Sequence, residues 1–164
     1  MSKKEHVFWG RVEEDWAGFS AGITFVSNYF DKEVILFLGE EYDEEGEEIE
    51  TTPTDKELTA YQKTYMRFLD HIEDIIKKIK KETFYRYKKL YAHYYENESK
   101  SGEKPLQIDS VEKHFKYITT INYIRILEND EIKILIHYKL DSEHGLELRV
   151  KNNQIVAIGG IAET

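Results

Sequence analysis

The sequence predicts an α+β fold, with an antiparallel sheet built from N-terminal and C-terminal meanders and two or three helices packed on one face. Residues 7–38 and 121–158 alternate between short apolar runs and polar turns, as strands do. Residues 54–95 instead repeat apolar side chains at spacings of three and four, as a helix does. Helices between two groups of strands are typical of α+β proteins. We expect residues 1–164 to form a single domain, because this length can bury a core.

The N-terminal strands are expected in three apolar runs, Val7–Val12, Trp16–Val26 and Val34–Leu38. Glu13–Asp15 is expected to break the first two runs apart, and Asn28–Lys32 to form a turn before the third. The third run has no polar residue, which predicts a strand covered on both faces.

An acidic tract follows these strands. Eight of the eleven residues from 40 to 50 are Asp or Glu, and Gly46 at the centre predicts a loop or the tip of a hairpin. A solvated loop is the simplest interpretation. The alternative is an electrostatic docking surface for a basic partner, because concentrated charge raises association rates. The partner-binding residues would then be Glu44, Glu45, Glu47 and Glu48.

The helical region begins with a capping box, in which Thr54 caps the helix and Glu57 reaches back to it. A helix from Thr54 to Tyr95 would be on the order of 60 Å long. A compact domain of this size has a radius of gyration of about 15 Å. We therefore expect a break or kink around Lys81–Thr83 and two helices packed on the sheet. The apolar stripe consists of Leu58, Tyr61, Tyr65, Phe68, Ile72, Ile75, Ile79, Phe84, Tyr87, Tyr91 and Tyr94.

The remaining elements follow from local signals. Residues 97–104 are expected to form a polar loop, and Asp109 or Ser110 to cap a short third helix. The C-terminal strands are then expected in four runs, with turns at residues 128–130 and 152–153. These runs are Ile121–Leu127, Glu131–Leu140, Leu146–Lys151 and Gln154–Ile158.

The corner between the second and third of these strands combines two carboxylates, an imidazole and a glycine. Asp141, Glu143 and His144 could bind a divalent metal or a small ligand, since such sites favour mixtures of His and carboxylate. The spacing matches no zinc signature, however. A structural turn is favoured instead, with Asp141 bonded to neighbouring amides and Gly145 supplying a positive φ.

Two further clusters are interpreted as structural. Residues 77–89 interleave Lys and Arg with aromatic side chains, as in some nucleic-acid-binding segments. On a helix, however, the aromatic residues belong to the buried stripe and the lysines to the solvent-exposed side. Trp9, Trp16 and Phe19 are expected to pack in the core. The chain has no Ser-His-Asp order, nucleophile elbow, phosphate-binding glycine loop or HExxH motif, so we expect no enzyme activity.

Composition and charge exclude further kinds of site and partner. The chain has no Cys, which excludes disulfides and thiolate metal sites. Its formal net charge of −9 disfavours nucleic acid. The charge is compatible with a basic protein partner, although a contribution to solubility alone is the simpler interpretation. No segment approaches the roughly 20 apolar residues of a membrane helix or has the form of a signal peptide. We expect a cytoplasmic protein with no cofactor, no bound metal and no membrane contact; its oligomeric state stays open.

The C-terminal corner also carries a family resemblance. The chain resembles a group of small bacterial proteins classed as domains of unknown function, in which a late strand is followed by Asp-x-Glu-His-Gly-Leu and a closing hairpin. Those proteins often have Trp before this Asp, where this chain has Leu140. The matching segments are Asp141-Ser142-Glu143-His144-Gly145-Leu146, Trp16-Ala17-Gly18, Gln62 and Tyr94-Tyr95.

The resemblance implies a binding role rather than an activity. Proteins of this group are suspected to be immunity proteins of bacterial toxin systems. Many immunity proteins neutralise nucleases by offering an acidic surface to a basic active site, an analogy at the level of class. The expected function is therefore a non-enzymatic binding protein, and specifically an immunity protein for a basic toxin. The alternatives are a metal- or small-ligand-binding domain using Asp141, Glu143 and His144, and a purely structural module.

Overall fold

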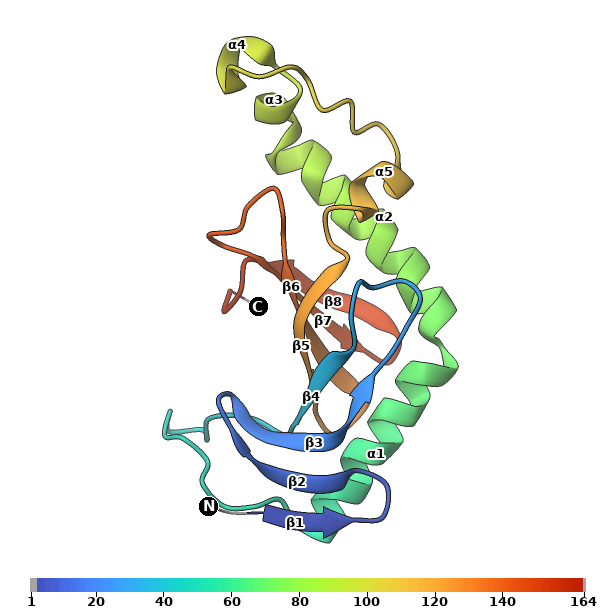
Figure 1. Ribbon diagram of the computed structural model, residues 1–164, viewed down its shortest axis with the longest axis vertical. Helices are drawn as coiled ribbons and strands as arrows, with labels where there is room; N and C mark the ends of the chain where they lie inside the picture. Colours follow the sequence, from blue (N-terminus) through green and yellow to red (C-terminus); the bar gives the residue numbers. More distant parts are fainter. Residues whose placement is uncertain (1–2, 164) are drawn as a thin grey trace.

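One eight-stranded sheet organises the protein. The computed structural model describes residues 3–163, and within them the strands lie in the sheet in chain order, from β1 at one edge to β8 at the other (Figure 1). The predicted α+β class is confirmed. The strands are β1 (Lys3–His6), β2 (Gly10–Asp15), β3 (Gly18–Phe25), β4 (Val34–Leu38), β5 (Thr120–Ile126), β6 (Glu131–His137), β7 (Leu146–Lys151) and β8 (Gln154–Gly159).

The sheet departs from the predicted antiparallel pattern at one position. All neighbouring strands are antiparallel except β4 and β5, which run parallel with Leu36 opposite Ile124. Parallel neighbours need a long crossover, and the whole helical region supplies it here. The same pair joins the N-terminal and C-terminal strands into a single sheet, which the sequence left undecided.

Two long helices run along one side of the sheet, and the short helices α3 and α4 lie beyond its end (Figure 1). The predicted capping box is confirmed, because Thr54 Oγ1 accepts from Glu57 N at 3.1 Å and Glu57 Oε1 accepts from Thr54 N at 2.9 Å. None of the described helices is both long and apolar enough to cross a bilayer. The helices are α1 (Asp55–Asp70), α2 (Ile72–Leu90), α3 (Ala92–Tyr95), α4 (Glu98–Ser101) and α5 (Val111–Phe115).

The break between the long helices lies at His71, so the prediction of a break at Lys81–Thr83 is wrong. His71 leaves the helical region, with φ −113° and ψ 17°. Helix α2 then continues through Thr83, whose hydroxyl donates to Ile79 O at 2.6 Å and is satisfied within the helix. The helices are not confined to the length of the sheet, because the second half of α2 extends past it and packs there against α5 (Figure 1).

The core lies between the long helices and the sheet. Most of the predicted helical stripe from Leu58 to Tyr87 is buried, Ile72 and Phe84 are partly exposed, and Tyr94 near its end is 44% exposed. Trp9 is fully buried and its indole N–H donates to Leu58 O at 2.9 Å, which ties the N-terminal strands to α1. The strands contribute a matching set of apolar side chains, among them Leu36, Leu38, Ile124, Ile126, Ile132, Ile134, Ile136, Leu146, Leu148 and Val150.

Several predicted boundaries shift. Residues 7–9 form a turn and residues 13–15 belong to β2, where they pair with β3 from Ser20 to Gly18. The expected loop at 97–104 contains α4, and β6 ends at His137, before Leu140. The predicted turns at 128–130 and 152–153 are confirmed. They use residues with positive φ, namely Asn129, Asp130, Asn152 and Asn153.

Candidate functional site

The Asp141–Gly145 corner is a tight turn held by its own backbone. Gly145 N donates to Asp141 O at 2.9 Å, and Ile161 N donates to His144 O at 2.9 Å. Gly145 has φ +66°, and a Cβ there would lie 2.6 Å from Ile161 Cδ1 and 3.2 Å from Ile136 O. The positive φ favours glycine at this position, and a side chain would also require Ile161 to move.

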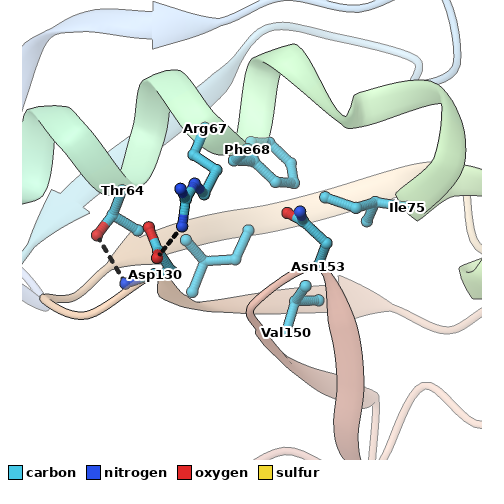
Figure 2. Close-up of a pocket in the computed structure, with 8 residues that line it drawn as sticks. Thr64, Arg67, Phe68, Ile75, Asp130, Val150 and Asn153 are labelled. Atoms are coloured by element: carbon cyan, nitrogen blue, oxygen red, sulfur yellow. Dashed lines mark hydrogen bonds and ion pairs between the residues drawn. The ribbon is translucent and has the colours of Figure 1, made fainter.

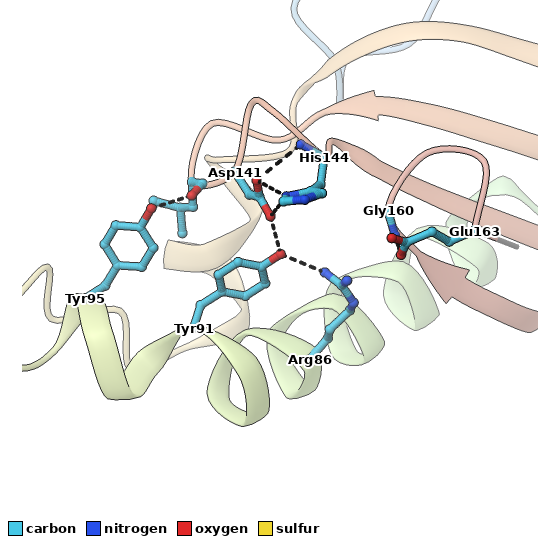
Figure 3. A network of polar contacts seen from close by, with 8 residues as sticks. Arg86, Tyr91, Tyr95, Asp141, His144, Gly160 and Glu163 are labelled. Atoms are coloured by element: carbon cyan, nitrogen blue, oxygen red, sulfur yellow. Dashed lines mark hydrogen bonds and ion pairs between the residues drawn. The ribbon is translucent and has the colours of Figure 1, made fainter.

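The Asp141 carboxylate connects this turn to the end of α2 (Figure 3). Its Oδ2 accepts from the Tyr91 hydroxyl at 2.7 Å, and its Oδ1 accepts from His144 N at 3.2 Å. Beside it, the Tyr95 hydroxyl donates to Leu140 O. Burial raises the pKa of Asp141, but the hydrogen bonds from Tyr91 and His144 outweigh burial and hold the pKa below its ordinary value.

His144 completes the turn at the surface. Its Nδ1 lies 2.9 Å from Asp141 Oδ1, and the bond to this carboxylate raises the pKa of the imidazole. The side chain of His144 is 60% exposed, and Glu143 is exposed beside it. The structure thus brings Asp141 and His144 together but leaves Glu143 outside. Within residues 3–163, no three His, Asp or Glu side chains are grouped so as to hold a metal ion. The contacts favour a structural role for the turn.

The acidic loop, residues 40–50, forms a small ordered hairpin tip. Asp43 Oδ1 accepts from the backbone N–H groups of Glu45 and Glu47, both at 2.9 Å. Gly46 closes the tip with φ +82°, and its N donates to Asp43 O at 3.0 Å. Because Asp43 holds the backbone, the neighbouring carboxylates are presented on a fixed frame. The four residues predicted to bind a partner are all exposed: Glu44, Glu45, Glu47 and Glu48.

The negative charge of the protein is concentrated at one end of the sheet. Residues 1–52, which contain β1–β4 and the acidic loop, hold four Lys or Arg and fourteen Asp or Glu, a net of −10. The rest of the chain therefore carries a net of about +1. The exposed lysines of residues 77–89 lie on α2, in a different part of the molecule, among them Lys77, Lys81, Lys88 and Lys89.

Sequence reasoning missed an exposed aromatic residue, Trp16, next to the acidic loop. Trp9 and Phe19 are buried as predicted, but Trp16 is 64% exposed, so its assignment to the core is wrong. It lies in the β2–β3 turn, where an outward position is common, and its ring meets Phe37 and Tyr123 edge-on at 5.1 and 5.2 Å between centroids. The sequence signal was present in Asp15 and Gly18, which flank a short turn.

A small cavity lies where α1 meets two hairpin turns (Figure 2). Its volume of about 10 Å³ holds about one water at most. An ion pair and a hydrogen bond connect the residues that line it. Arg67 Nη1 lies 2.5 Å from Asp130 Oδ2, and Thr64 Oγ1 accepts from Asp130 N at 3.2 Å. This contact fastens the β5–β6 turn to α1 and is structural. The lining residues are Thr64, Arg67, Phe68, Ile75, Asp130, Ile132, Val150 and Asn153.

Comparison with known proteins identifies one family. The model of a domain of unknown function, DUF6985, matches residues 8–163, which is nearly the whole chain. No curated protein and no solved structure matches the sequence or the fold.

Proposed function

The chain belongs to the DUF6985 family of domains of unknown function, and we propose that it is a non-enzymatic binding protein whose acidic loop docks a basic protein. The observation that carries the proposal is the ordered display of four exposed glutamates on a backbone held by Asp43. An ordered loop loses less conformational entropy on binding than a flexible one.

The charge distribution supports the same interaction. A net of −10 within residues 1–52 creates a field of one sign at one end of the molecule. Such a field accelerates encounter with a positively charged partner and repels acidic proteins. Exposed ion pairs contribute little affinity one by one, so the loop acts chiefly through steering and orientation.

In its most specific form, the proposed partner is a basic toxin and the protein is its cytoplasmic immunity protein in a bacterium. The resemblance of the Asp141–Leu146 turn to small bacterial proteins of suspected immunity function supports this form. An acidic surface that covers a basic active site would block substrate access without any chemistry by the binding protein.

The test uses the protein and the purified product of the adjacent gene, with binding followed at several salt concentrations. Reversing the charge of the four loop glutamates to Lys should lower the association rate by tenfold or more at low salt, because steering depends on unscreened charge. The effect should shrink near physiological ionic strength. The four substitutions are Glu44→Lys, Glu45→Lys, Glu47→Lys and Glu48→Lys.

A matched control changes the net charge by the same amount at exposed carboxylates outside residues 1–52. If this variant slows association as much as the loop variant does, net charge rather than the loop is responsible. A neighbouring gene product that neither binds the protein nor is toxic would contradict the proposal that the protein is an immunity protein. The control substitutions are Asp70→Lys, Glu82→Lys, Glu98→Lys and Glu103→Lys.

A further inference from the structure

Trp16, Phe37 and Tyr123 form an aromatic platform on the sheet, with Trp16 outermost. Phe37 is fully buried and lies 5.0 Å from Tyr123 between ring centroids. Trp16 rests edge-on against both rings and leaves 64% of its surface in solvent. Its backbone N–H donates to Asp15 Oδ1 at 2.8 Å, which fixes the turn that presents it. A large aromatic side chain is thus held at the surface instead of being buried.

The buried side chain of Arg125 packs against the rings of Phe37 and Tyr123. Its side chain is only 5% exposed, and its guanidinium lies 5.5 Å from the rings of Phe37 and Tyr123. Its Nη2 donates to Ala17 O at 2.6 Å and its Nη1 donates to Gly39 O at 2.8 Å. These bonds connect the Trp16 turn to the end of β4. The platform is therefore preorganised, which reduces the entropy lost when a partner binds.

The platform and the acidic loop form one continuous surface. A Cβ on Gly18, two residues after Trp16, would lie 3.9 Å from the Cα of Glu41 at the start of the loop. Glu41 Oε1 also lies 3.7 Å from Arg125 Nη2. Tyr42 is 54% exposed, and nearby Glu41 raises the pKa of its hydroxyl. The turn that carries Trp16 therefore lies beside the start of the acidic loop.

We propose that Trp16 is the anchor of the docking surface and receives an Arg or Lys side chain from a cationic segment of the partner protein; this inference rests on the proposed function. Trp has the most favourable ring face for a cation, and Trp is enriched among the residues that dominate binding energy. The carboxylates of the adjoining acidic loop select the sign of the partner's charge. The loop steers the cationic segment, and Trp16 retains it.

The experiment titrates the full-length protein with an oligoarginine peptide and follows tryptophan fluorescence. Trp9 is fully buried, so a change in emission reports on Trp16. We expect the wild type to show a saturable change and Trp16→Ala to raise the Kd about two- to fivefold, the factor that a cation–π contact at an exposed site supplies. Trp16→Phe should fall between them, because its ring binds a cation more weakly. Binding by the variants is measured calorimetrically.

Tyr85→Ala is the matched control, because Tyr85 is 61% exposed but lies on α2. It should bind the peptide as the wild type does. Equal affinity of Trp16→Ala and wild type, with weakened binding by the loop variant, overturns the anchor and leaves the proposed function standing. Unchanged binding by the loop variant overturns the acidic docking surface and the anchor together. Thermal unfolding identifies any variant that fails to fold, and Trp16→Phe then decides the question.

Discussion

His114 lies almost wholly buried between α2 and the sheet, where its protonation state affects stability. Its Nε2 is 2.7 Å from the Tyr138 hydroxyl oxygen, and its ring centroid is 5.3 Å from that of Tyr87. Among the described residues, none forms a hydrogen bond with its Nδ1. Burial lowers the pKa of the imidazole to about 4, so the folded protein holds His114 neutral.

The stability contributed by neutral His114 should be lost in acid. Between an unfolded pKa of about 6.5 and the folded value of about 4, the unfolded chain binds the extra proton, so stability falls as the pH falls. The loss attributable to this group at pH 4 is roughly 3 kcal/mol. Urea unfolding at pH 7 and pH 4 measures it. His114→Gln, which stays neutral, should lose less stability than the wild type over this range; an equal loss would exclude His114 as the cause.

Replacing Gly145 with Ala tests whether steric conflict adds to the cost of a positive φ at this position. Gly145→Ala places a methyl group against Ile161 and the carbonyl of Ile136 at φ +66°. Gly102→Ala is the matched control, because Gly102 has φ +77° but open space within 4 Å of where a Cβ would lie. We expect the control to cost about 1 kcal/mol of unfolding free energy and Gly145→Ala to cost about 1–3 kcal/mol more. Equal costs would show that the turn accommodates the methyl group.

At the scale of elements, Glu96 ties the segment that returns from α4 to the end of α2. Its carboxylate accepts from the Tyr87 hydroxyl at 2.5 Å and from the backbone N–H groups of Gln107 and Ile108 at 2.7 and 3.1 Å. Burial raises the pKa of Glu96, but these three bonds outweigh it and the pKa is lowered. The carboxylate therefore stabilises the folded state at neutral pH, and this contribution is lost as the pH falls below its ordinary pKa.

Glu96→Gln should lower the unfolding free energy at pH 7 by about 1.5–3 kcal/mol, because an amide replaces a charged acceptor. It should also speed hydrogen exchange at the Ile108 amide. Glu98→Gln, two residues away and exposed, is the matched control and should have little effect. If the two variants exchange Ile108 at the same rate, Glu96 does not hold the returning segment.

Elements encoded by neighbouring residues were predictable from the sequence. The Thr54 capping box needs only Thr54 and Glu57, and the turn at residues 152–153 needs only two asparagines, which tolerate positive φ. The break at His71 was not predictable, because neither Pro nor Gly marks it. Asp15 and Gly18 indicated a turn at Trp16, but the hydrogen bond that Arg125 donates to Ala17 O within that turn comes from a residue distant along the chain.

On the scale of the whole molecule, the sequence predicted the class of fold but not its shape. Compactness suggested that the helices end where the sheet ends, yet α2 extends past it and packs there with α5. The parallel contact between β4 and β5 likewise depends on where the crossover returns, which periodicity does not encode. For the candidate site, the exposed glutamates were predicted, whereas the adjoining aromatic platform required the folded structure.

The strand order also governs how the chain reaches this structure. Within β1–β4, neighbouring strands of the sheet are also consecutive in the chain, so this half can assemble through short loops as soon as residues 3–38 are available. The same holds for β5–β8. Joining the halves requires β4 to meet β5 across the entire helical region, and closing so long a loop costs more chain entropy than any hairpin. We therefore expect the pairing of β4 with β5 to be the slowest step in the formation of the sheet.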